Sequence, residues 1–181
     1  MKQSAVDLSG LTLANGTTRN NFFITLAEED ADLKVSGFSL TAGGAHTDNF
    51  SFIEHAVPHC TSDELFKYIL RDESRGVFTG RILVAQDAQK TQAYQNNRNL
   101  LLSPSARMQS KPQLEIYADD VKCSHGMTTG QLSEEALFYM RQRGISLEEA
   151  RLMLSNAFAE DVLARIPVEE LAETLRSCVE E

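Results

Sequence analysis

The spacing of apolar residues changes once along the chain, and this change limits the possible folds more than any other feature. From residue 6 to about residue 123, short apolar segments alternate with polar residues at period two and are separated by Gly, Asn, Asp or Ser. Such a pattern is typical of many short β-strands. From about Gln131 the apolar residues recur at helical spacing. The sequence therefore predicts a β region, residues 1–130, followed by a helical subdomain, residues 131–181.

Capping residues predict three helices in the C-terminal subdomain. Ser133 can cap the first helix, and Gly144 suits the left-handed residue that follows its end. Ser146 and Glu149 match the capping box of a second helix. Pro167 suits the first position of a third helix, where its missing N–H costs nothing.

The β region could form a sandwich, a barrel or a parallel β-helix. Asn15-Gly16 is the one dipeptide that suits a tight hairpin, and few such turns are expected when strands run parallel. This scarcity favours a parallel β-helix, in which each coil stacks on its neighbour. Residues 62–70 are ambiguous, because their apolar positions also fit a helical turn.

Charge and composition restrict the kinds of partner and the compartment. Acidic residues outnumber basic ones by 26 to 17, so nucleic acid and anionic membranes are not expected partners. No apolar stretch approaches the roughly 18 residues of a membrane span. The three cysteines (Cys60, Cys123 and Cys178) are far apart and odd in number, which argues against a disulfide framework. A reducing cytoplasm is the expected location.

Cys123 and His125 form the most chemically suggestive pair. If this segment is a strand, both side chains face the same side, roughly 6–7 Å apart at their Cα atoms. A thiolate and an imidazole suit iron or zinc, although two ligands do not complete a coordination sphere. The alternative is a small buried cysteine beside a hydrogen-bonded histidine, and the spacing alone favours this structural interpretation.

Enzymatic alternatives also remain open at this stage. His46 and Asp48 could form a Cys–His–Asp set with Cys60 or Cys123. A β-helix hydrolase or lyase could use Asp119, Asp120 and a histidine. However, the chain has no Trp and only four Tyr, which is a poor supply for stacking on sugars. The sequence contains no P-loop or zinc-protease motif, and four zinc ligands at structural spacing are not evident.

Several long strings of the chain resemble the SufB/SufD family of iron–sulfur cluster assembly proteins. The resemblance is carried by residues 74–78, 86–91, 99–103, 110–126 and 135–145, in this order. It implies a right-handed parallel β-helix followed by a small three-helix subdomain. Family members are usually longer, with more β-helix, so we expect the chain to correspond to the C-terminal portion, with the β-helix truncated at its N-terminal end.

The resemblance also implies a role as a non-catalytic scaffold. In the family, SufB and SufD pair through their β-helices, and each offers its C-terminal helices to one copy of the ATPase SufC. His125, with Cys123 beside it, is then a candidate ligand for a transient iron–sulfur cluster at the subunit interface, and no stably bound cofactor is expected. The Lys-Cys-Ser-His-Gly string of residues 122–126 is more similar to SufD, while a SufB paralogue with the same role remains the alternative. The isolated chain could pair with itself as a homodimer.

Overall fold

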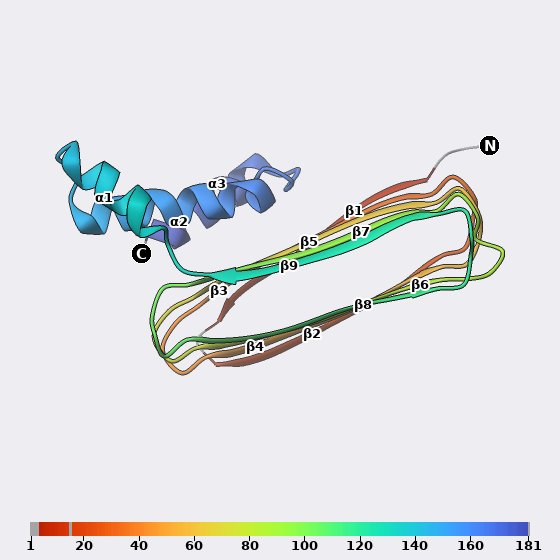
Figure 1. Ribbon diagram of the computed structural model, residues 1–181, viewed down its shortest axis with the longest axis horizontal. Helices are drawn as coiled ribbons and strands as arrows, with labels where there is room; N and C mark the ends of the chain where they lie inside the picture. The colour runs from red at the N-terminus through yellow and green to blue at the C-terminus, as the bar shows by residue number, and fades with distance from the viewer. Residues whose placement is uncertain (1–3, 15, 181) are drawn as a thin grey trace.

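Two parallel sheets form the β region of the computed structural model, which describes residues 4–14 and 16–180 (Figure 1). Consecutive strands belong to alternate sheets, so the chain winds as a parallel β-helix with two strands in each coil. This confirms the predicted architecture, and a sandwich or barrel is wrong. The first sheet contains β1 (Ala5–Ala14), β3 (Asp32–Thr41), β5 (Thr61–Leu70), β7 (Gln92–Leu101) and β9 (Lys122–Gly130); the second contains β2 (Thr17–Leu26), β4 (His46–His55), β6 (Arg75–Val84) and β8 (Arg107–Ile116).

Neighbouring strands of each sheet are aligned in register, which reveals a repeat that is hidden in the sequence. In the first sheet Asp32 is aligned with Thr61, Thr61 with Gln92, and Gln92 with Lys122. Aligned residues of parallel strands point to the same side, so side chains from successive coils stack in rows. The same corner recurs as well, because Asp30, His59 and Lys90 all have φ near +61°.

β5 resolves the ambiguous segment as a strand, and the helical-turn alternative is wrong. Its side chains are buried on both sides of the sheet. Phe66 and Tyr68 belong to the apolar cluster inside the β-helix, whereas Leu65 and Ile69 belong to a second cluster beneath the C-terminal helices. Burial on both faces explains why this strand has a continuous apolar run in place of a clean alternation.

Three helices follow the last strand, as predicted: α1 (Glu134–Gln142), α2 (Leu147–Leu163) and α3 (Glu169–Glu180). The hydroxyls of Ser133 and Ser146 accept hydrogen bonds from the backbone of their first turns, at 3.2 and 3.1 Å, and so cap α1 and α2. Gly144 adopts the expected left-handed conformation, with φ of 86°. No helix in the described part of the chain is long and apolar enough to cross a membrane.

The predicted place of Pro167 at the start of the third helix is wrong by two residues. The backbone carbonyl of Val168 accepts the N–H of Ala172 at 3.1 Å, so Val168 holds the capping position and α3 begins at Glu169. Pro167 therefore lies outside the helix, directly after the buried Ile166.

α2 and α3 cover the outer face of the first sheet, where they share an apolar cluster with β3, β5 and β7 (Figure 1). A buried lysine fixes this contact. The Lys67 ammonium donates to the Asp161 carboxylate at 2.7 Å and to the Phe158 carbonyl at 2.6 Å, and it lies 4.6 Å from the centre of the Phe158 ring. Since the Lys67 side chain is only 2% exposed, these partners replace the water that the charge has lost.

We expect Lys67→Met to lower the free energy of unfolding by about 1–3 kcal/mol, because it leaves two helix groups without their charged donor. Arg98→Met is the matched control. Arg98 also contacts Asp161, at 3.1 Å, but its side chain is 50% exposed, so its loss is expected to cost less than about 1 kcal/mol. Urea denaturation of both variants measures the difference. An equal or larger loss in Arg98→Met would contradict the anchoring role of Lys67.

The interior of the β-helix contains polar rows beside its apolar cluster. Asn97 and Asn99 of β7 are buried, and the Asn99 amide donates to the Asn97 side chain at 2.7 Å and to the Thr128 carbonyl of the next coil at 3.1 Å. On the opposite wall, Asn20 donates to the aligned Asn49 at 2.8 Å. Buried amides thus link successive coils where an apolar side chain would leave backbone and side-chain groups unpaired.

Two titratable side chains are also enclosed in this interior. Glu64 is fully buried and accepts a hydrogen bond from Gln95 at 2.6 Å. Burial raises the pKa of Glu64 to about 7, although the nearby Ser51 hydroxyl and the Gln95 amide favour the charged form. His55 is fully buried against the Ser62 hydroxyl at 2.8 Å, and burial lowers its pKa to about 4.

These shifts give opposite pH dependences of stability. Because the pKa of Glu64 is raised from 4.5 to about 7, its contribution is present below pH 4.5 and is lost as the pH rises through 7. Because the pKa of His55 is lowered from 6.5 to about 4, its contribution is present above pH 6.5 and is lost as the pH falls towards 4. As the pH rises between 4.5 and 6.5, the loss from Glu64 and the gain from His55 therefore largely cancel, and the Glu64 contribution becomes visible when Glu64 is replaced.

We expect Glu64→Gln to remove the alkaline loss. The difference in unfolding free energy between the variant and the wild type should rise by up to about 3 kcal/mol between pH 4.5 and pH 8, since one pKa unit corresponds to about 1.4 kcal/mol. Denaturation at several pH values measures it, with Glu54→Gln on the half-exposed outer face of β4 as the control. A difference that stays constant with pH would contradict the buried, proton-binding state of Glu64.

Candidate functional site

Cys123 and His125 lie on β9, the last strand of the first sheet. They are aligned with Ala93 and Gln95 of β7, both of which are fully buried in the interior. Their side chains therefore share the interior side of the sheet, as the sequence analysis expects. β9 has a neighbour only on its β7 side in the sheet, so His125 is exposed although it faces inwards. The pair thus lies at the uncovered end of the β-helix.

Cys123 is a free, half-buried thiol that packs against the interior apolar cluster. Burial raises its pKa, and a hydrogen bond with the Ala93 backbone only partly offsets this effect. The thiol is consequently protonated at neutral pH, and it becomes a thiolate ligand only when a metal ion or a cationic group displaces its proton.

The pair lacks further strong ligands of its own. Within residues 4–14 and 16–180, no group of three or more His, Cys, Asp or Glu side chains is arranged to hold a metal ion. Cys123 and His125 alone supply only two of the ligands that a coordination sphere needs. The site is therefore open, with two donors offered at the edge of the protein.

Two interior residues that the sequence analysis did not select lie in the same row as His125. Gln95 is the aligned neighbour of His125, and Glu64 is the aligned neighbour of Gln95. Glu64, Gln95 and His125 are spaced one coil apart in the sequence. This spacing predicts that they are neighbours only when the register of the coils is known. Both are fully buried, which is unusual for these residue types.

The structure does not assemble the Cys–His–Asp set that the sequence left open. Cys60 is fully buried in the interior cluster, and its thiol donates to the Glu28 carbonyl at 3.3 Å. His46 and Asp48 lie on the other face of β4, where Asp48 pairs with Arg19 at 3.5 Å. The sheet itself separates them from both Cys60 and Cys123, so the catalytic alternative is wrong for these residues.

The acidic corner that follows β8 also has structural contacts. Asp120 forms an ion pair with Lys90 of the preceding coil, and its backbone N–H donates to the Gln89 side chain at 2.9 Å. The Ser62–His55 pair resembles part of a hydrolase site, yet both residues are fully buried, and His55 Nδ1 has no hydrogen-bond partner within the described part of the chain. Neither feature supports a β-helix hydrolase or lyase.

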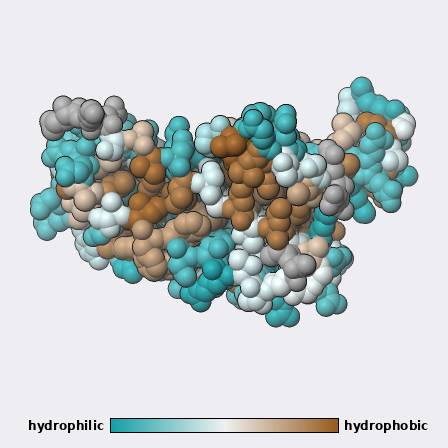
Figure 2. Space-filling view, turned by 180° about the vertical axis from the view of Figure 1, so that it is seen from behind, coloured by the Kyte–Doolittle hydropathy of each residue, from teal (hydrophilic) through white to brown (hydrophobic). Residues whose placement is uncertain are grey.

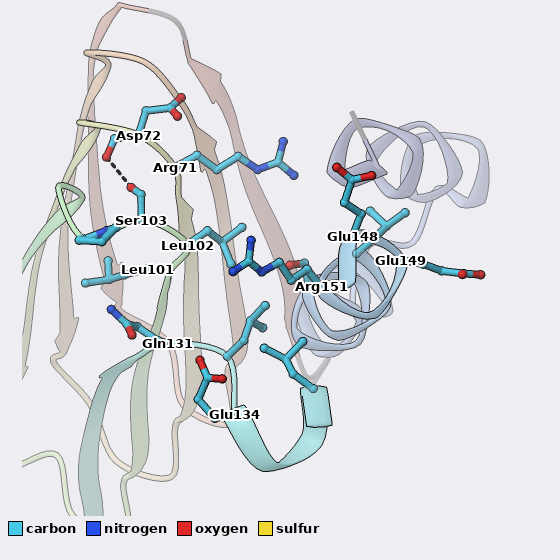
Figure 3. Close-up of a pocket in the computed structure, with 15 residues that line it drawn as sticks. Arg71, Asp72, Leu101, Leu102, Ser103, Gln131, Glu134, Glu148, Glu149 and Arg151 are labelled. Atoms are coloured by element: carbon cyan, nitrogen blue, oxygen red, sulfur yellow. Dashed lines mark hydrogen bonds between the residues drawn. The ribbon is translucent and has the colours of Figure 1, made fainter. Parts of the chain in front are cut away.

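A cleft of about 700 Å³ separates the β-helix from the helices at the other end of the strands (Figure 3). Arg71 extends from the β-helix and Arg151 from α2, and Glu134, Glu148 and Glu149 lie at its helical side. The Arg71 guanidinium is already used, because it donates to the Val179 carbonyl of α3 at 2.8 Å. The cleft is lined by charges of both signs, and Arg71 already joins the β-helix to α3. We therefore interpret it as a structural junction between the β-helix and the helical subdomain.

The helical subdomain exposes apolar side chains on its outer surface. Phe138 and Tyr139 of α1 are 66% and 58% exposed, and they line a shallow hollow of about 570 Å³ together with Glu134, Glu135 and Gln142. Exposed aromatic residues rimmed by charged groups are typical of protein interaction surfaces.

The comparisons with known proteins agree with this geometry. Residues 1–158 match the family described as SUF system FeS cluster assembly, SufBD core domain. The chain is 41% identical to an iron–sulfur cluster assembly SufBD family protein of Synechocystis, over 98% of this chain and 39% of that protein. It is 41% identical to the iron–sulfur cluster assembly protein SufD of Escherichia coli, over 83% of this chain and 36% of SufD.

A third relative is the chloroplastic protein ABCI7 of Arabidopsis thaliana, which is 35% identical over 98% of this chain and 38% of its own length. The chain thus spans less than half the length of these relatives. The family match covers most of the chain, including the whole β-helix and the greater part of α2. The chain belongs to the SufBD family of iron–sulfur cluster assembly proteins.

Proposed function

We propose that the chain acts as a non-catalytic, SufD-type scaffold subunit of a cytoplasmic Suf complex that assembles iron–sulfur clusters. The observation that carries the proposal is the pair of candidate ligands, Cys123 and His125, side by side at the uncovered end of the β-helix. The 41% sequence identity between the chain and SufD of Escherichia coli favours a SufD-type subunit over the SufB alternative.

The uncovered end of the β-helix is the proposed surface for a SufB-like partner. β8 and β9 are the last strands of the two sheets, and each leaves one edge of backbone donors and acceptors unpaired. Such edges readily accept a strand from another chain, and a related β-helix offers two of them at the right separation. In the absence of the partner, a second copy can occupy the same edges and give a homodimer.

Pairing at this end would complete the ligand sphere that this chain leaves open. Cys123 and His125 offer one soft and one borderline donor, which suit iron and its sulfur species. The partner would then supply the remaining ligands, and the cluster would form between the two subunits before it leaves. The cluster is cargo in this scheme and no resident cofactor is required.

We expect His125→Ala to reduce cluster formation by the complete complex at least about tenfold, because one ligand at the interface is lost. The measurement is anaerobic reconstitution followed by absorption spectroscopy and iron and sulfide determination. His46→Ala, on the outer face of β4, is the matched control and should keep full assembly. Both variants should still co-purify with the SufB-like partner. Undiminished cluster formation by His125→Ala would refute the ligand role.

The C-terminal helices are the proposed docking site for the ATPase SufC. α2 and α3 are fixed to the β-helix by their shared cluster and by Lys67, whereas Phe138 and Tyr139 of α1 remain exposed. An aromatic anchor on a firmly held subdomain can pass the movement of an ATPase to the rest of the complex.

We expect the tagged chain to retain co-expressed SufC, and Phe138→Asp to weaken this contact at least about tenfold, as for a central interface aromatic. Phe23→Asp is the control, because Phe23 is 72% exposed on the β-helix, far along the chain from the helices. Removal of residues 131–181 should abolish retention. If the folded wild-type chain fails to bind SufC, or if both aspartate variants bind equally well, α1 is not the docking surface.

A further inference from the structure

One row of the β-helix interior changes from apolar to polar as it approaches the candidate site. The aligned residues in successive coils are Leu8, Val35, Glu64, Gln95 and His125. Val35, Glu64 and Gln95 are at most 1% exposed, so the row runs from the apolar interior to the exposed His125. Gln95 and Glu64 therefore form a buried polar support directly behind His125.

The amide of Gln95 is held in one orientation. Its Nε2 donates to the Glu64 carboxylate at 2.6 Å, while its carbonyl oxygen, Oε1, is buried and has no hydrogen-bond partner among the residues that the structure describes. A buried acceptor without a partner is costly, so a donor at this point would be strongly favoured. Since Nε2 is already bound on the Glu64 side, Oε1 is the group left for the neighbouring coil.

The opposite wall is shaped around this amide. Gly80 of β6 faces Gln95, and a Cβ atom at position 80 would lie 2.3 Å from Gln95 Nε2. A side chain there would displace the amide from Glu64. The glycine thus leaves the space that the Glu64–Gln95 pair requires.

We propose that Gln95 is a positioning residue for His125, and that Gln95 Oε1 accepts a ring N–H of His125 and so fixes its tautomer. Adjacent strands lie about 4.8 Å apart, and both side chains face the interior, so rotation of the imidazole brings a ring N–H to Oε1. The other ring nitrogen then presents its lone pair outwards. This is the usual arrangement behind a metal-binding histidine, whose second nitrogen donates to a fixed acceptor.

Glu64 acts one step further back. By accepting from Nε2 it prevents the amide from turning over, which would direct an NH₂ group at His125. A donor at that place would compete for the lone pair of the imidazole in place of orienting it. The hydrogen bond between Gln95 and His125 does not depend on the proposed function. The role of the outward lone pair, as a ligand during cluster assembly, rests on that function.

The tautomer of His125 tests the inference on the purified chain without any metal. ¹⁵N-histidine labelling and long-range ¹H–¹⁵N NMR at pH 8 report which ring nitrogen carries the proton, and His125→Asn assigns the signal among the four histidines. We expect one tautomer to dominate in the wild type. Gln95→Met keeps the volume and removes the acceptor, so the tautomer ratio should change about two- to tenfold. Glu64→Gln, which frees the amide to turn, should give a smaller change in the same direction.

Asn97→Leu is the matched control, because it removes a buried amide from the same strand but is aligned with Met127. Its His125 tautomer ratio should equal that of the wild type, and dispersed amide spectra verify that each variant is folded. Equal ratios in the wild type and Gln95→Met overturn the inference and leave the proposed function intact. A changed ratio with undiminished cluster assembly by Gln95→Met and by His125→Ala supports the positioning role and refutes the ligand role.

Discussion

In-register stacking of the coils is the constraint on which the rest of the structure depends. Backbone hydrogen bonds join each strand to the strand one coil away, and the alignment continues without a shift from β3 to β9. The aligned residue in the preceding coil therefore determines whether a side chain points into the β-helix or away from it. A shift by one position would exchange the interior and exterior side chains. Ile24, Ile53 and Ile82 form one such row inside the β-helix.

Because the coils are stacked in register, each row of aligned side chains can be apolar or polar independently of the other rows. One wall of the interior keeps its isoleucine row, while the row of Glu64 and Gln95 becomes polar as it nears the exposed end. On the outside, β5 presents Leu65 and Ile69 to α2 and α3, with Lys67 between them as a charged anchor. The opposite end, around β1 and β2, exposes the apolar side chains of Val6, Leu13 and Phe23, and Figure 2 shows apolar surface gathered there.

The sequence predicted strands and helix ends well where the pattern lies within one strand or at one helix cap. Alternation marked most strands, and Ser133, Ser146 and Gly144 marked the helix ends as found. It left residues 62–70 open between a strand and a helical turn, because burial on both faces removes the alternation, and it was wrong at Pro167, where Val168 takes the capping position. Of the candidate site, strand periodicity placed Cys123 and His125 on one side. Gln95 and Glu64 were out of reach, because their position behind His125 depends on coil lengths and not on any local pattern.

The attachment of the helices has a mechanical consequence. α2 lies on β3 and β5, whereas β9 is joined to α1 only through residues 131–133. A load applied to the helices enters the middle of the stack, where strands held by rows of backbone bonds on both edges resist shear. A load carried by α2 and α3 thus enters strands other than β9, the strand on which the candidate ligands Cys123 and His125 lie.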